Sequence, residues 1–138
     1  MPARDIYHEH VKHALMSDGW TITHDPFTLK WGAKDLFVDL GAERLLAAEK
    51  NSQKIAVEIK SFIGPSDVVD LEKALGQYIV YHDILAEREA DRVLYLAVTE
   101  EAMTEIFEEP LGQLLLRNQR TRLIVFDPVR EVILRWIA

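Results

Sequence analysis

The sequence contains no cysteine, which excludes disulfides, thiolate nucleophiles and cysteine-ligated zinc or iron–sulfur centres. It also lacks an apolar run near the roughly 20 residues that span a bilayer, a Gly-rich phosphate loop and a serine in a nucleophile elbow. An excess of positive charge is missing as well, because 16 lysines and arginines face 23 acids and give a formal charge of −7. That charge argues against non-specific coating of nucleic acid. A metal would need carboxylate or imidazole ligands, and a nucleic-acid role would need a local site.

The composition is typical of a globular protein. Hydrophobic residues make up 49% and charged residues 28% of the 138 residues, so we expect one domain over residues 1–138 with a sizeable core. The N-terminal residues lack the apolar stretch of a signal peptide. We therefore expect a soluble, cytoplasmic protein that does not enter a membrane.

Hydrophobic periodicity and turn residues predict the order of helices and strands. Helical spacing favours helices over residues 5–17, 67–87, 101–107 and 111–118. Strand patterns occur over residues 20–23, 36–50, 54–61, 92–99, 122–126 and 129–137, with a further short extended piece over 27–31. The run 92–99 is continuously apolar, which indicates a central strand buried on both faces. The predicted order is αβββαβαββ, an α/β sandwich around a mixed sheet.

Two charged residues share one face of the predicted strand 54–61. Strand alternation places Glu58 and Lys60 on the same side as Ala56. Across the predicted hairpin, Leu45 and Ala47 would extend that face, so it is partly apolar. A salt-bridge ladder on a solvated face is the ordinary interpretation of such a charge pair. Because the face is partly apolar, enclosed charges that need a partner or an ion are the alternative.

A second carboxylate is expected near Glu58 and Lys60. If the hairpin turns at Asn51 and Ser52, Lys50 lies opposite Gln53 and Glu43 lies opposite Lys60. Asp39 lies four residues earlier, and a register shift or a bulge at Gly41 decides which of the two acids comes closer. Two carboxylates beside a lysine form an oxygen-rich site suited to Mg²⁺ or Mn²⁺. Lys60 would then orient or activate a water and stabilise charge on phosphorus.

These residues resemble the signature of the PD-(D/E)XK nucleases, an acid on one strand followed by (D/E)-x-K on the next. Asp39 and the string Glu58-Ile59-Lys60 match it, although Val38 stands where the signature has proline. Gln77 and Tyr81 are similar to the Q-x-x-x-Y motif of RecB-type members, and spacing four puts both on one helix face, where we expect a buried Gln77 beside a cavity. Glu9 resembles the acid of the superfamily's first helix.

The resemblance implies a restriction-endonuclease-like three-layer α/β sandwich and a hydrolytic site for Mg²⁺ or Mn²⁺. The metal ligands would be drawn from Asp39, Glu43, Glu58 and Glu9. The catalytic residues would be Asp39, Glu43, Glu58, Lys60, Gln77 and Tyr81.

Four longer strings resemble the XisH-type fdxN-element excision controlling factors, which are small cyanobacterial proteins. They are GWTITHDP at 19–26, DLGAE at 39–43, AVEIKSF at 56–62 and ALGQY at 74–78. The resemblance implies a part in controlling site-specific excision of a DNA element, together with an XisI-type companion protein and as a homodimer or hetero-oligomer. Two functions stay open. One is metal-dependent cleavage of DNA, and the other is a non-catalytic nuclease fold that binds its partner through an acidic surface.

Other polar clusters have simpler explanations. His10 and His13 share a helix face while His8 points elsewhere, so we expect a polar helix face rather than a zinc site. The basic string at residues 117–122 is expected to be a solvated connection, with a phosphate contact as the alternative.

Overall fold

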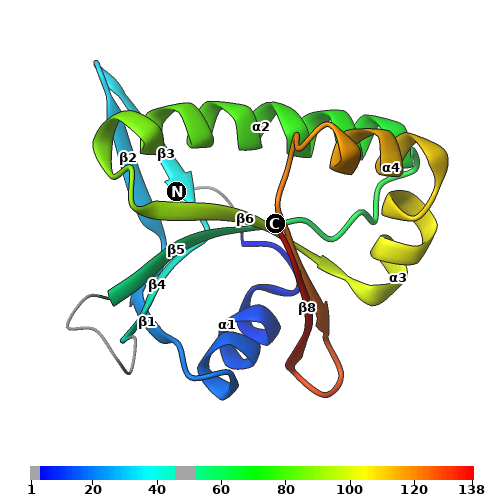
Figure 1. The fold of residues 1–138 in the computed structure, drawn as a ribbon, viewed down its shortest axis with the longest axis horizontal. Helices are drawn as coiled ribbons and strands as arrows, with labels where there is room; N and C mark the ends of the chain where they lie inside the picture. The colour runs from blue at the N-terminus through cyan, green and yellow to red at the C-terminus, as the bar shows by residue number, and fades with distance from the viewer. Residues whose placement is uncertain (1–3, 46–51) are drawn as a thin grey trace.

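Strands precede and follow one long helix in the computed structural model, which describes residues 4–45 and 52–138 (Figure 1). The expected hairpin residues Lys50 and Asn51 lie outside these ranges. The elements are α1 (His8–Ser17), β1 (Thr21–His24), β2 (Phe27–Trp31), β3 (Lys34–Val38), β4 (Leu40–Leu45), β5 (Ser52–Ile59), α2 (Asp67–Arg88), β6 (Arg92–Thr99), α3 (Glu100–Ala102), a π-helical turn (Met103–Phe107), α4 (Pro110–Arg117), β7 (Leu123–Asp127) and β8 (Val132–Ile137).

The described strands form one large mixed sheet and one separate hairpin. The large sheet has the order β1-β4-β5-β6-β7-β8, in which β5, β6 and β7 run parallel and the other neighbours pair antiparallel. β2 and β3 pair with each other. α2 and α4 cover one face of the sheet and α1 covers the other (Figure 1). The predicted α/β fold with a mixed central sheet is confirmed.

The strand expected over residues 36–50 is two strands that meet at Asp39. β3 ends at Val38 and pairs with β2, whereas β4 begins at Leu40 and enters the large sheet. The piece over 27–31 is therefore a full strand. Five strands precede α2 in the described chain, rather than the three of the predicted order. Periodicity missed this division because both strands are extended and only their partners differ.

Gly41 is explained by close packing and not by a bulge in its own strand. A Cβ atom at Gly41 would lie 2.9 Å from Cδ2 of Phe27 and 3.0 Å from Nδ1 of His24. The ladder irregularity lies in the neighbouring β1, between Ile22 and His24. Only glycine lets the turn before β2 pack this closely on β4.

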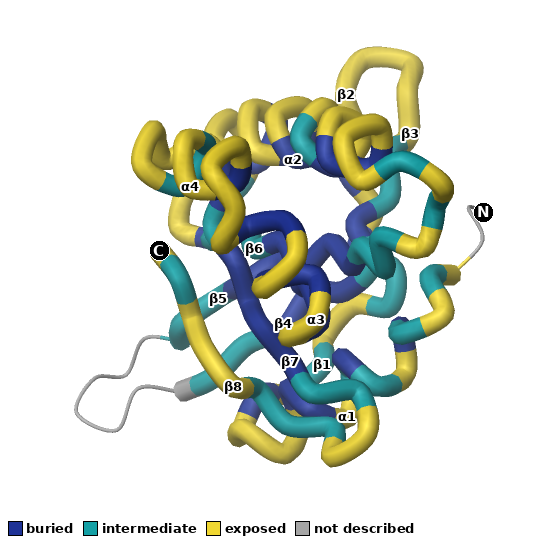
Figure 2. The backbone as a smooth tube through the Cα atoms, turned by 90° about the vertical axis from the view of Figure 1, so that its right-hand side faces the viewer, coloured by how far each residue is buried: buried dark blue, intermediate teal, exposed yellow. Residues whose placement is uncertain are grey.

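Two apolar clusters hold the helices against the sheet. Leu71, Ala74, Tyr78 and Leu85 of α2 pack on one face, and Val11 of α1 belongs to the cluster on the other face. The central strands are buried between these layers (Figure 2). Each fully buried aliphatic side chain contributes about 1.5–3 kcal/mol, so both faces of the sheet are strongly anchored. No helix in the described part of the chain is long and apolar enough to cross a membrane.

Candidate functional site

The pairing of β4 with β5 determines which acid lies beside Glu58. Arg44, and not Lys50, pairs with Gln53, while Glu43 pairs with Lys54 and Leu40 with Val57. The predicted register, with Glu43 opposite Lys60, is therefore wrong. The same ladder extended by one residue places Asp39 next to Glu58. The register was missed because it assumed a tight turn, and the first pair of the ladder joins Leu45 to Ser52 instead.

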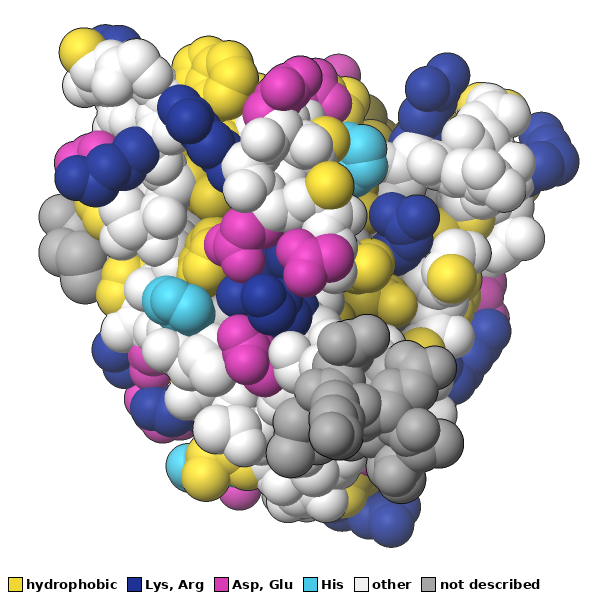
Figure 3. Space-filling view, turned by 60° about the vertical axis from the view of Figure 1, so that its left-hand side comes forward, with side chains coloured by type: hydrophobic (Ala, Val, Ile, Leu, Met, Phe, Trp, Pro, Cys, Tyr) yellow, Lys and Arg dark blue, Asp and Glu magenta, His cyan; other side chains and the backbone are white. Residues whose placement is uncertain are grey.

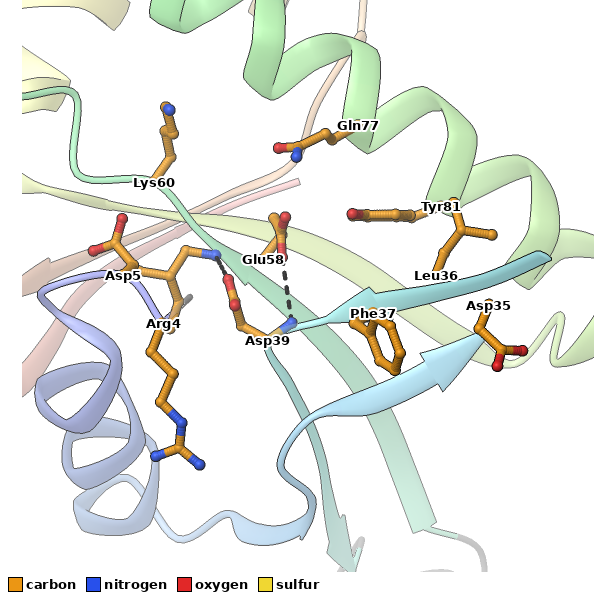
Figure 4. Close-up of a pocket in the computed structure, with 11 residues that line it drawn as sticks. Arg4, Asp5, Asp35, Leu36, Phe37, Asp39, Glu58, Lys60, Gln77 and Tyr81 are labelled. Atoms are coloured by element: carbon orange, nitrogen blue, oxygen red, sulfur yellow. Dashed lines mark hydrogen bonds between the residues drawn. The ribbon is translucent and has the colours of Figure 1, made fainter. Parts of the chain in front are cut away.

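Asp39 and Glu58 are held together by reciprocal hydrogen bonds. The backbone N–H of Asp39 donates to Oε1 of Glu58 at 3.2 Å, and the backbone N–H of Ile59 donates to Oδ2 of Asp39 at 2.7 Å (Figure 4). These bonds occur where the chain passes from β3 into β4. At this point a side-chain oxygen accepts the backbone hydrogen bond that a carbonyl of a neighbouring strand would otherwise accept. Each strand thus fixes the other strand's carboxylate.

The carboxylate pair opens into a cleft of about 420 Å³. The lining residues are Arg4, Asp5, Asp35, Leu36, Phe37, Asp39, Glu58, Ile59, Lys60, Gln77 and Tyr81. The cleft brings together the motif residues on β5 and those on α2, with Gln77 and Tyr81 pointing down from the helix (Figure 4). Gln77 is exposed, contrary to the expectation that it is buried, whereas Tyr81 is only 8% exposed.

Burial and mutual repulsion dominate the electrostatics of the pair. Glu58 is 7% exposed. Burial and then the neighbouring Asp39 carboxylate raise the pKa of Glu58 far above its ordinary value. Burial also raises the pKa of Asp39, although hydrogen bonds to Glu58 and Ile59 act in the opposite direction. Burial and the two carboxylates raise the pKa of Tyr81 to about 12. The cleft therefore favours a positive charge beside the pair.

The donor set fits a hard divalent cation. Two carboxylates from adjacent strands converge on an open cleft, and oxygen donors of this kind are the ligands that Mg²⁺ and Mn²⁺ prefer. Without a cation, a buried pair of carboxylates reduces its charge by keeping a proton, in line with the raised pKa of both groups. A divalent ion would replace that proton.

Lys60 lies at the edge of the cleft. Its Nζ is 3.9 Å from Oδ1 of Asp70, a residue of α2, and its side chain points away from the carboxylate pair (Figure 4). Asp70 also accepts a hydrogen bond from the N–H of Gly64 at 2.9 Å. A Cβ atom at Gly64 would lie 2.8 Å from both Asp70 oxygens, so this contact depends on glycine. Sequence reasoning missed Asp70 because only the packing of α2 beside the end of β5 brings it close to Lys60.

Glu43 and Glu9, two predicted metal ligands, are not among the cleft residues. Oε1 of Glu43 lies 3.6 Å from Nη2 of Arg92, a buried residue. Glu9 is exposed and contacts Arg4 at 3.0 Å. Paired charges of this kind are common on protein surfaces, and acidic and basic side chains lie side by side near the middle of the face in Figure 3.

Asp5 is the acid that the N-terminal segment contributes to the cleft. Its carboxylate accepts hydrogen bonds from the N–H of Tyr7 at 2.9 Å and from the N–H of Ser61 at 3.0 Å. Its charge adds to the rise in the pKa of both Asp39 and Glu58. The sequence signal was an acid at the start of the predicted helix 5–17, which is ordinarily interpreted as part of a helix cap.

His8 and Lys12 connect α1 to Asp25, which lies between β1 and β2. Nε2 of His8 lies 2.7 Å from Oδ1 of Asp25, and Lys12 donates to the other oxygen at 2.9 Å. Although burial opposes it, these two bonds lower the pKa of Asp25. Donor atoms of His8, Glu9 and Asp25 lie within 4.8 Å of one another, but Lys12 already supplies positive charge to Asp25. This arrangement favours an ion-pair network over a metal site.

Known proteins resemble the chain over almost its whole length. The family model described as XisH protein matches residues 1–134. The crystal structure of an XisH family protein from Nostoc punctiforme has 38% sequence identity and a TM-score of 0.87, covering 97% of this chain and 100% of that one. The crystal structure of an fdxN element excision controlling factor protein from Anabaena variabilis has 40% identity and a TM-score of 0.86, covering 98% and 100%. No curated protein matches the sequence.

Proposed function

Because this chain belongs to the XisH family, we propose that it is a controlling factor for site-specific excision of a DNA element. The support is the 40% identity, over 98% of this chain and 100% of that one, to the fdxN element excision controlling factor protein of Anabaena variabilis. DNA and an XisI-type companion protein are the proposed partners, and a homodimer or a hetero-oligomer is the proposed assembly.

The proposed activity is metal-dependent hydrolysis of a DNA phosphodiester on a restriction-endonuclease-like PD-(D/E)XK fold. The observation that carries it is the pair Asp39 and Glu58, cross-bonded across two strands at an open cleft. Two carboxylates that repel each other at a cleft wall cost stability. A purely structural protein has no physical need for that cost, whereas a cation-binding hydrolase does.

Five of the cleft residues have a proposed task. Asp39 and Glu58 would hold Mg²⁺ or Mn²⁺, and the bound ion would neutralise a phosphate oxygen and acidify a water. Lys60, at the edge of the same cleft, would leave Asp70 and donate to the attacking water or to the phosphate. Gln77 and Tyr81 would position the phosphodiester from α2.

One observation favours a second candidate function. Lys60 contacts Asp70 and points away from the carboxylate pair (Figure 4). In a non-catalytic protein this contact would be permanent, and the chain would act by binding its companion. The acidic segment 100–109 would then supply the contact surface.

Metal binding and DNA cleavage by matched variants distinguish the two functions. Calorimetry should show Mn²⁺ binding by the wild type and its loss in Asp39→Asn and Glu58→Gln. Glu43→Gln removes the same charge outside the cleft and should bind Mn²⁺ normally. Lys60→Ala should still bind Mn²⁺ but cleave DNA about 10²-fold more slowly, as expected for the loss of one electrostatic stabiliser.

Two results would contradict the catalytic proposal. Equal loss of Mn²⁺ binding in Glu43→Gln and Glu58→Gln would remove the assigned site. A folded Lys60→Ala protein that binds its companion and supports excision in cells as well as the wild type would favour the non-catalytic function.

A further inference from the structure

The hairpin of β2 and β3 projects beyond the body of the molecule next to α2 (Figures 1 and 2). Its tip, residues 30–35, is exposed throughout. Trp31 and Lys34 close the ladder, so Gly32 and Ala33 form a two-residue turn. Gly32 has a φ of 59°, which suits the first central position of a type II′ hairpin turn. The tip is thus an ordered element that the rest of the described chain leaves open to solvent.

The tip combines two lysines with an aromatic side chain. Lys30 and Lys34 are exposed, and neither forms an ion pair with another described residue. Trp31 is 46% exposed. The guanidinium carbon of Arg88 lies 4.9 Å from the centre of the Trp31 ring, so the end of α2 brings a third cation to the tip. Lys34, the ladder partner of Trp31, and Arg88 flank the tryptophan, whereas Lys30 lies on the other face of the hairpin beside its ladder partner Asp35. Three cations and one acid still contrast with the net charge of −7 of the whole chain.

The base of the hairpin forms one wall of the cleft. Phe27, Leu29 and Val38 are buried and anchor the base in the core. Asp35, Leu36 and Phe37 of β3 line the cleft (Figure 4). Lys34 precedes Asp39 by five residues, about 17 Å of extended strand, which is about the rise of five base pairs of DNA.

We infer that the tip of this hairpin is a nucleic-acid contact that holds the DNA strand whose phosphate enters the cleft. Lys30 and Lys34 bind phosphates, and Trp31 stacks one face on an unpaired base while Arg88 lies over its other face. This inference rests on the proposed function, because it assumes that the bound DNA strand has a phosphate in the cleft. The physical need is clear: phosphates approach a cleft lined by Asp5, Asp35 and the carboxylate pair, and nearby cations must offset that repulsion.

The test is binding of fluorescein-labelled DNA by fluorescence anisotropy, without metal so that no cleavage occurs. The probe is a duplex with a short single-stranded extension, compared with a blunt duplex. Lys30→Ala/Lys34→Ala should weaken binding at least tenfold and reduce the slope of log affinity against log salt by about 2. The matched control, Arg130→Ala/Arg135→Ala, removes two exposed cations from the β7–β8 hairpin and should change the affinity much less.

Trp31 is tested by two substitutions. Trp31→Ala should abolish the preference for the extended probe, and Trp31→Phe should keep it, because phenylalanine retains a stacking face. Thermal melting confirms that each variant is folded, which is expected because the side chain lies at the exposed tip.

The outcomes separate the hairpin from the cleft. If the tip double variant and the control double variant weaken binding equally, or if Trp31→Ala keeps the preference, the hairpin inference is wrong, while Mn²⁺ binding that depends on Glu58 still supports the proposed function. If the wild type binds neither probe, the inference is overturned as well. If Mn²⁺ binding does not depend on Glu58 while the hairpin variants change DNA binding as expected, only the proposed function is contradicted.

Discussion

Replacing Glu58 by glutamine should stabilise the metal-free protein at neutral pH. Burial raises the folded-state pKa of both Asp39 and Glu58, and the neighbouring Asp39 carboxylate raises that of Glu58 further. A raised pKa contributes stability that is fully present below the unfolded-state pKa and is lost as the pH rises towards the folded-state value. Glutamine keeps the acceptor for the N–H of Asp39 and adds a donor for the Asp39 carboxylate. The substitution therefore removes the charge repulsion from the Asp39 carboxylate and keeps the shape of the side chain.

The size of the effect follows from proton uptake. If the folded pair holds one proton that the unfolded chain releases, the wild type loses about 1.4 kcal/mol of stability per pH unit. Between about pH 5 and pH 7 the loss is about 3 kcal/mol, and Glu58 is too deeply buried for solvent to screen much of it. For a domain of this size, that corresponds to a rise of about 10 °C in the Tm of Glu58→Gln at pH 7.

The assay is urea unfolding followed by circular dichroism across this pH range, first with a chelator and then with millimolar Mg²⁺. Glu58→Gln should show a flatter pH dependence than the wild type, and Mg²⁺ should stabilise the wild type but not Glu58→Gln. Glu43→Gln should keep the wild-type dependence on both. A metal-free Glu58→Gln protein less stable than the wild type at pH 7, or equally stabilised by Mg²⁺, would refute the argument.

Three further predictions concern residues outside the carboxylate pair. Arg92→Met should lower the free energy of unfolding by about 2 kcal/mol, because the buried guanidinium donates to the carbonyl of Ile55 at 2.9 Å. The Mn²⁺ affinity should stay unchanged, and a loss of Mn²⁺ binding would contradict the separation of Arg92 from the metal site. Gly41→Ala should lower stability by about 1–3 kcal/mol, because its Cβ would lie 2.9 Å from Phe27; an unchanged Tm would show that the neighbouring turn gives way. Light scattering should show a species larger than the 15.9 kDa chain, alone or with the companion; a monomer in both samples would contradict the proposed assembly.

The motif residues were predictable because their placement is local. Glu58 and Lys60 follow from strand alternation, and Gln77 and Tyr81 follow from helical spacing, so the cleft could be outlined from the sequence. The second acid was not predictable from the residues alone. Whether Asp39 or Glu43 lies beside Glu58 depends on the strand register, which a connection of unknown shape determines.

The acid of the N-terminal segment shows the same limit. Glu9 lies on α1 and Asp5 precedes it, and only Asp5 lines the cleft. That choice depends on how the helix docks against the sheet, a tertiary property with no periodic signal. The division of the expected strand at Asp39 was hidden for a related reason, because β3 and β4 are continuous in pattern and differ only in the strands with which they pair.

Asp39 stands alone between β3 and β4, so the projecting hairpin and the large sheet meet at a candidate metal ligand. The hairpin can tilt as a unit about its buried base, and the Asp39 carboxylate lies close to that base while the tip lies far from it. A sideways displacement of 1 Å at the tip, about 17 Å away, corresponds to a tilt of about 3° at the base. Strain applied at the tip would therefore reach the carboxylate geometry through the chain itself, without an intervening layer of packed side chains.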